Sequence, residues 1–207
     1  MHTATNSQKD WAITLLKARG PMRGFELRDA GVHPETLARL LGDEALIRVA
    51  RGLYQLADAD VSTAHELAEV AKLVPKGVVC LVSALQFHEL TLQISSRVWL
   101  AIGQKARRPR IEYPPIRFVR FGPMALSPGA QTHNIDGVPV AISDPAKTVV
   151  DCFRFRRHVG LDVALEGLHN AVKSGKAKPA DMVEYARDTR IWSVFRPYLE
   201  AVVADGA

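Results

Sequence analysis

Apolar positions in the first 42 residues follow three short helical patterns. Residues 7–19, 23–30 and 34–41 each place aliphatic or aromatic side chains three and four positions apart, as one face of a helix requires. Gly31 ends the second pattern, and Pro34 follows at once in the first turn of the third, where proline is tolerated. The sequence therefore predicts three helices, with a tight turn between the second and the third.

The helical spacing then changes to a strand pattern in the stretch ALIRVARGLYQLAD. Two β-prone runs, residues 46–49 and 53–56, flank Ala50-Arg51-Gly52, and the glycine can adopt the positive φ of a tight turn. Helix, helix, turn, helix and hairpin is the order of a winged helix-turn-helix. A small helical cap on a larger domain is the alternative. The hairpin, with Arg51 at its tip, favours the winged helix, whose wing contacts the phosphate backbone or the minor groove.

The remaining chain predicts an α+β domain. Residues 58–62 are polar and acidic, as expected of a linker, so we predict domains at residues 1–57 and 61–207. Asp144 is a predicted helix cap with proline after it, and Asp136-Gly137 is a predicted hairpin turn. The predicted helices are 62–74, 78–90, 144–153, 161–173, 179–188 and 194–203, and the predicted strands lie in 97–103, 116–122 and 132–143. The predicted fold class is therefore α+β, with a winged helix-turn-helix followed by a mixed α+β domain that has a small sheet and flanking helices.

Charge is concentrated in one segment of this second domain. The chain has a net charge of +5, which favours an anionic partner. Residues 97–120 contain seven basic side chains and one acid, Glu112, so the rest of the chain is nearly neutral. Arg107, Arg108 and Arg110 are therefore candidates for secondary phosphate contacts. A solvated connecting loop is the alternative for this segment.

Residue patterns for catalysis are missing from the sequence. The seven histidines form no HxxxH or HExxH pair, and neither Cys80 nor Cys152 joins them, so we predict no metal site and no cofactor. A metal-dependent nuclease would need an acid and a lysine one residue apart on a strand, whereas Asp144 and Lys147 are three apart and begin a helix. We therefore expect that this protein is not an enzyme. The polar N-terminus and the short apolar runs predict a cytoplasmic protein without membrane segments.

The run GPMRGFELRDAGVHPETLARLLGDEALIRVARGLYQL resembles the winged helix of AbiEi antitoxins from type IV toxin–antitoxin systems. The most specific points of the resemblance are Arg51, Gly52 and Tyr54 of the hairpin and the later run SDPAKTVVDCF. Similar segments extend over nearly the whole chain.

The resemblance implies a repressor that binds inverted repeats in double-stranded DNA upstream of its own operon. It also implies that the second domain counters a nucleotidyltransferase-like toxin without requiring a stable complex. By the same resemblance, DNA contacts are expected from the outer face of the third helix, at His33, Thr36 and Arg39, and from Arg48 and Arg51 of the wing. A nuclease or other enzyme with a winged helix, and a plain regulator without a toxin, are the alternatives.

Overall fold

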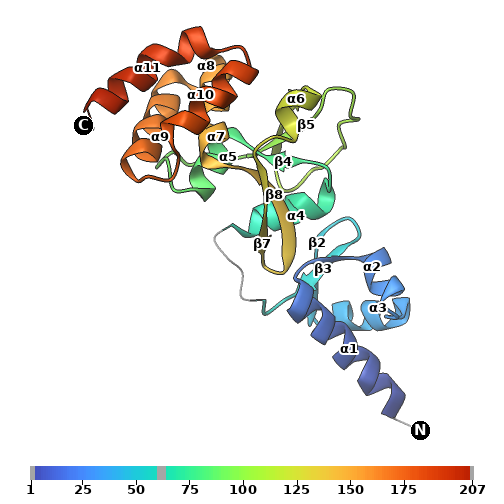
Figure 1. Ribbon diagram of the computed structural model, residues 1–207. Helices are drawn as coiled ribbons and strands as arrows, with labels where there is room; N and C mark the ends of the chain where they lie inside the picture. The colour runs from blue at the N-terminus through green and yellow to red at the C-terminus, as the bar shows by residue number, and fades with distance from the viewer. Residues whose placement is uncertain (1–2, 60–63, 206–207) are drawn as a thin grey trace. The chain divides into compact units, whose positions relative to one another are not determined.

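The computed structural model describes residues 3–59 and 64–205 (Figure 1), and their contacts form two compact units. The first unit comprises Met1–Pro75 and His133–Val140, and the second comprises Lys76–Thr132 and Ala141–Ala207. The α+β class is confirmed, with helices and a three-stranded sheet in the first unit and a five-stranded mixed sheet with helices in the second.

The first unit contains the predicted winged helix. Its elements in chain order are α1 (Thr3–Arg19), β1 (Met22–Arg23), α2 (Gly24–Asp29), α3 (Pro34–Gly42), β2 (Leu46–Ala50) and β3 (Leu53–Leu56). The strands are antiparallel in the order β1-β3-β2. Gly52 connects β2 to β3 with a φ of +71°, as the predicted turn required. Strand β1 was not predicted, because two residues carry no periodicity.

The winged helix has its own apolar core. Leucines of all three helices and of both wing strands are almost inaccessible to solvent, and Met22 of β1 joins them. The buried members are Ala12, Leu15, Leu16, Met22, Leu27, Val32, Leu37, Leu40, Leu46 and Leu56. Burying aliphatic side chains of this size contributes about 1.5–3 kcal/mol each. Leu37 and Leu40 of α3 belong to this core, so the third predicted helix is present and packs by one face, as predicted.

Two segments outside residues 1–57 also belong to the first unit. Helix α4 (His65–Leu73) follows the wing, and the tip of the hairpin of β7 (Ala130–Ile135) and β8 (Val138–Ser143) lies beside the end of α1. His65 joins these segments, since its Nδ1 lies 2.6 Å from Asp136 Oδ2 and its Nε2 lies 2.8 Å from Gln55 Oε1. Both contacts link parts of the chain that sequence patterns cannot connect.

The five-stranded sheet of the second unit has the order β6-β5-β4-β8-β7. Strand β4 (Val78–Val79) lies at its centre, antiparallel to β5 (Val98–Gly103) and parallel to β8, while β6 (Ile116–Phe121) pairs parallel with β5. The prediction of one helix over residues 78–90 was wrong. Helix α5 is only Leu81–Phe87, because a continuously apolar run is equally compatible with a buried strand.

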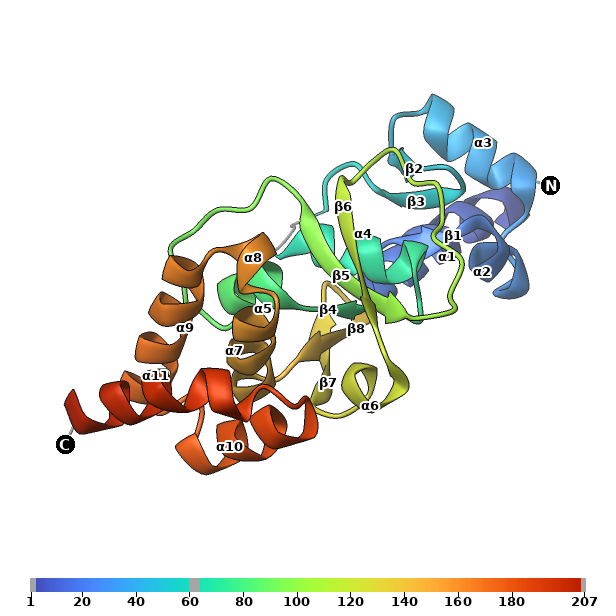
Figure 2. The ribbon, with the colours of Figure 1, turned by 90° about the horizontal axis from the view of Figure 1, so that it is seen from above.

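Helices of the second unit surround α7, which covers one face of the sheet (Figure 2). Val149, Val150, Cys152 and Phe153 of α7 are fully buried, as predicted. The helices are α6 (Pro123–Leu126), α7 (Pro145–Arg154), α8 (Arg156–Val159), α9 (Leu161–Lys173), α10 (Pro179–Asp188) and α11 (Trp192–Asp205). The predicted Asp136-Gly137 turn is present, with φ of +49° and +77°. Asp144 caps α7 by accepting a 2.7 Å hydrogen bond from the Lys147 N–H.

The predicted division into residues 1–57 and 61–207 remains a prediction. The compact unit that holds the winged helix is larger, because it includes α4 and the tip of the β7–β8 hairpin. Residues 60–62 of the predicted linker and the predicted helix caps Ser62 and Thr63 lie outside the described residues. Among the described helices, none is both long and apolar enough to cross a membrane.

Candidate nucleic-acid interface

Helix α3 presents a narrow exposed face. His33 precedes the helix and is exposed, and Arg39 is exposed near its end. Thr36, by contrast, is 5% exposed, so its predicted place on the outer face is wrong. Thr36 lies one turn before the buried Leu40 and shares its face, which is a signal that the sequence contained. The exposed residues within the helix are Pro34, Glu35, Ala38, Arg39 and Gly42.

Helix α1 holds the turn between α2 and α3. The Gln8 side-chain amide donates to the Gly31 carbonyl oxygen at 3.1 Å and accepts from the His33 backbone N–H at 3.3 Å. At the other end of α3, Lys9 forms an ion pair with Asp43. Two successive residues of α1 therefore contact both ends of α3. This arrangement orients the exposed face of α3 before any partner binds.

The wing carries exposed arginines at the predicted positions. Arg48 lies in β2, opposite Tyr54 of β3, and Arg51 lies at the turn. Residues 45–57 contain no acidic side chain, so no intrasegment carboxylate competes with phosphate for these guanidinium groups. An arginine at a wing tip has the charge and reach for phosphate contacts, which position a protein on DNA without specifying sequence.

Arg23 ties the wing to the rest of the unit, a role that the sequence did not indicate. Its Nη1 donates to the Arg51 carbonyl oxygen at 3.3 Å, while Nε and Nη2 donate to the Lys72 carbonyl oxygen at 3.2 and 3.1 Å. The Gly24 N–H also donates to the Gly52 carbonyl oxygen at 2.9 Å. Lys72 of α4 forms an ion pair with Glu26 of α2, with 2.8 Å between Lys72 Nζ and Glu26 Oε1. The wing tip is thus bonded to β1, α2 and, through Arg23, α4.

The second predicted patch lies in the connection from β5 to β6. Arg107, Arg108 and Arg110 are all exposed, and the Arg108 guanidinium lies 5.2 Å from the centre of the Phe118 ring. Arg120 of β6 holds the start of this connection by donating to the carbonyl oxygens of Gln104 at 2.6 Å and Ala106 at 3.0 Å. The three arginines therefore lie near an edge strand with the positive charge that phosphate contacts need.

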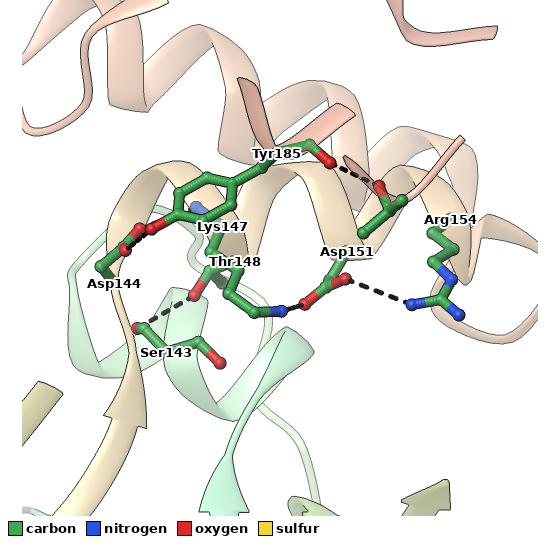
Figure 3. Close-up of polar contacts among 8 residues, drawn as sticks. Ser143, Asp144, Lys147, Thr148, Asp151, Arg154 and Tyr185 are labelled. Carbon is green, nitrogen blue, oxygen red and sulfur yellow. Dashed lines mark hydrogen bonds and ion pairs between the residues drawn. The ribbon is translucent and has the colours of Figure 1, made fainter. Parts of the chain in front are cut away.

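A buried polar cluster at α7 is the other concentration of charged groups (Figure 3). Lys147 and Asp151 form an ion pair and are 3% and 1% exposed. Asp144 accepts a 2.7 Å hydrogen bond from the Tyr185 hydroxyl of α10, and the Thr148 hydroxyl donates to the Ser143 carbonyl oxygen at 3.1 Å. The Arg154 Nη1 atom lies 4.0 Å from Asp151 Oδ1. These contacts attach α7 to the end of β8 and to α10.

Burial shifts the pKa of two groups in this cluster, Asp151 and Tyr185. It raises the pKa of Asp151, against the opposing effect of the Lys147 ammonium group. Burial and the hydrogen bond to Asp144 likewise raise the pKa of the Tyr185 hydroxyl. The acid and the lysine that a nuclease interpretation would need, Asp144 and Lys147, are a helix cap and half of a buried ion pair. The described residues contain no group of three or more His, Cys, Asp or Glu side chains arranged for a metal ion.

Comparison of the sequence with protein families finds a match at the winged helix. Residues 23–57 match the family model described as a transcriptional regulator, AbiEi antitoxin. These residues comprise the last residue of β1, helices α2 and α3 and both wing strands, so the match covers the exposed face of α3 and the arginines of the wing. The resemblance noted from the sequence is confirmed over this segment. Comparison with curated proteins finds no match.

Comparison with solved structures supports the fold of the whole chain. The crystal structure of the RV2827C protein from Mycobacterium tuberculosis aligns with a TM-score of 0.63. The alignment covers 95% of this chain and 77% of that chain, at 12% sequence identity. At this identity the similarity concerns the fold alone, and it extends through both compact units.

Proposed function

We propose that this protein is a DNA-binding repressor of its own operon and the antitoxin of a type IV toxin–antitoxin system. In this proposal His33 and Arg39 of α3 contact DNA, together with Arg48 and Arg51 of the wing, and the protein has no catalytic activity. Its DNA partner is a double-stranded operator with inverted repeats. Arg107, Arg108 and Arg110 supply secondary phosphate contacts.

One observation carries the DNA-binding part of the proposal. The segment that matches the AbiEi transcriptional regulator family is also the segment that forms a winged helix with an exposed, positively charged wing. The family match implies DNA binding, and the geometry supplies an exposed helix braced at both ends together with arginines beside it. Phosphate contacts by such arginines position a recognition helix on the duplex.

The antitoxin part of the proposal rests on the family and on the division of labour between the units. The second unit has its own apolar core around α7 and contains strands β4, β5 and β6 with part of β7 and β8, which is enough chain for a role independent of DNA. We assign neutralisation of a nucleotidyltransferase-like toxin to this unit, without a stable antitoxin–toxin complex. A cytoplasmic location follows from both roles.

Separation of the two activities in cells tests the proposal. The full chain, expressed from an unrelated promoter, should repress a reporter driven by the DNA upstream of its own gene and should restore growth when the neighbouring gene is induced. The double variant Arg39→Ala/Arg51→Ala should lose most of the repression and retain the growth rescue, because both substitutions lie in the first unit. The matched control Arg190→Ala/Arg196→Ala, in the second unit, should repress like the wild type.

The two parts can fail separately. Absence of binding to the upstream DNA in a titration at low salt would contradict the repressor role. A fully folded, repressing chain that gives no rescue would leave a plain regulator. Degradation of nucleic acid by the purified protein in the presence of magnesium would instead favour the nuclease alternative.

A further inference from the structure

The exposed face of α3 is a single stripe with a definite chemical order. Glu35, Ala38, Arg39 and Gly42 are exposed, at the spacing i, i+3, i+4 and i+7 of one helical face. Thr36, Leu37 and Leu40 are buried in the unit. Any surface that α3 meets therefore meets a carboxylate, a methyl group, a guanidinium group and a bare backbone, in that order.

Glu35 and Arg39 do not neutralise each other. They are four residues apart, where a salt bridge commonly forms on a helix, yet within the described part of the chain no ion pair joins them. Both charged groups are exposed and can form hydrogen bonds with a ligand. An exposed carboxylate beside an exposed guanidinium distinguishes this helix from a simple positively charged surface.

Each member of the stripe matches one feature of a base edge in the major groove. Arginine donates two hydrogen bonds to guanine O6 and N7, a carboxylate accepts from the cytosine N4 amino group, and alanine contacts the thymine methyl group. Gly42 has no side chain, and a Cβ atom added there would meet nothing within 4 Å, so the helix end presents only its backbone. Glu35 lies in the first turn of α3, the part of a recognition helix that contacts bases, and Arg39 follows on the same face one turn later.

Helix geometry converts this order into a spacing along DNA. Four residues of an α-helix rise by about 6 Å, and base pairs in B-DNA are about 3.4 Å apart. We propose that α3 reads a C·G pair through Glu35 and a G·C pair through Arg39, about two base pairs apart, with a thymine between them against Ala38. This inference rests on the proposed DNA-binding function and specifies the half-site that the function recognises.

Glu35 has a second effect, because a carboxylate is repelled by phosphate and by the acceptor oxygens of guanine and thymine. Glu35 therefore rejects guanine and thymine by repulsion and favours a base with an amino donor in the major groove, at the expense of overall affinity. The two charged residues should consequently respond to substitution in opposite directions. Loss of Glu35 strengthens binding to arbitrary DNA, whereas loss of Arg39 weakens it.

Selection from a randomised duplex library with the full chain tests the inference. The enriched motif should contain the C·G and G·C pairs at this spacing. In a titration of the enriched duplex and its single-base variants, the wild type should discriminate about 5- to 150-fold at each of the two positions. Glu35→Gln should remove discrimination at the cytosine and tighten binding to random duplex. Arg39→Ala should remove discrimination at the guanine and weaken binding to random duplex.

Arg28→Ala is the matched control, because Arg28 is exposed on α2 and lies outside the stripe. It should leave the pattern of discrimination unchanged. An enriched motif that keeps all its preferences in both Glu35→Gln and Arg39→Ala overturns this inference while leaving DNA binding intact. A wild-type chain that binds no duplex overturns the inference and the proposed function together. Circular dichroism of each variant checks that it is folded, so that differences in binding reflect the substituted side chain.

Discussion

At the residue scale, Arg51 separates phosphate contact from base recognition. The Arg51→Ala variant should weaken binding to every duplex by a similar factor, because a phosphate contact carries no sequence information. The slope of log affinity against log salt should fall by about one unit at most. Arg196→Ala removes the same charge from α11 and should leave both quantities unchanged. Affinity measured by fluorescence anisotropy across a salt series checks this prediction, and an unchanged affinity at low salt would remove Arg51 from the interface.

Glu69 is a second single residue with a measurable consequence. Its side chain is almost fully buried, 3.4 Å from the His65 ring, and its Oε2 has no hydrogen-bond partner among the described residues. Burial raises the pKa of this carboxyl above its ordinary value of 4.5, while His65 lowers it and Glu66 raises it by smaller amounts. Folding therefore favours the protonated form of Glu69.

The sign of the pH dependence follows from that raised pKa. The stability associated with neutral Glu69 is fully present below pH 4.5 and is lost as the pH rises through the higher folded-state pKa. Glu69→Gln stays neutral, so it should be more stable than the wild type at about pH 8 and similar at about pH 4. Urea midpoints of both proteins across this range are the measurement. If Glu69→Gln were more stable than the wild type by the same amount at both pH values, the Glu69 carboxyl would not titrate as inferred.

At the scale of an element, α7 depends on its buried ion pair. Lys147→Met would leave the Asp151 carboxylate buried without its partner, at an expected cost of about 3–5 kcal/mol in the free energy of unfolding. Lys147→Met/Asp151→Leu should recover most of that loss, because neither buried charge remains. Arg154 is about one-third exposed and can turn to water. Urea unfolding of the two variants tests this, and a double variant less stable than the single one would contradict it.

We predict that the position of the wing depends on the geometry of the Arg23 guanidinium group more than on its charge. Arg23 donates to carbonyl oxygens of Arg51 and Lys72 from three nitrogen atoms of one planar group. Lysine cannot reproduce this fork, so Arg23→Lys should behave like Arg23→Ala. Both should speed hydrogen exchange of the Gly24 amide proton, which donates to the Gly52 carbonyl oxygen of the wing, and weaken DNA binding. If Arg23→Lys bound DNA like the wild type, charge alone would account for Arg23.

At the scale of the whole molecule, the arginine patch of the second unit tests whether both units contact DNA. Reversal of Arg107, Arg108 and Arg110 to glutamate should weaken operator binding, and the salt slope should fall by about 0.9 for each phosphate that is no longer bound. The control reverses three exposed basic residues of the same unit, Lys178, Arg190 and Arg196, and so matches the change in net charge. Equal affinity of the two triple variants in the same titration would assign the patch to a solvated loop.

The local sequence pattern was sufficient to predict the elements whose signals lie within a few residues of one another. The helix from Pro34, the turn at Gly52, the Asp136-Gly137 hairpin and the cap at Asp144 all depend on backbone preferences and nearby hydrogen bonds, which act over one turn of chain. The wing arginines were visible for the same reason, since a hairpin exposes its tip. Pattern was ambiguous at residues 78–90, where a uniformly apolar run fits a buried strand and a buried helix equally well.

Long-range contacts were required for the composition of the first unit. The burial of Thr36 did not need them, because its position one turn before Leu40 already places it on the apolar face of α3. Arg23 meets Lys72, and His65 meets Asp136, across 49 and 71 positions of the chain. Periodicity describes which face of one element is apolar, and it carries no information about which distant element covers that face.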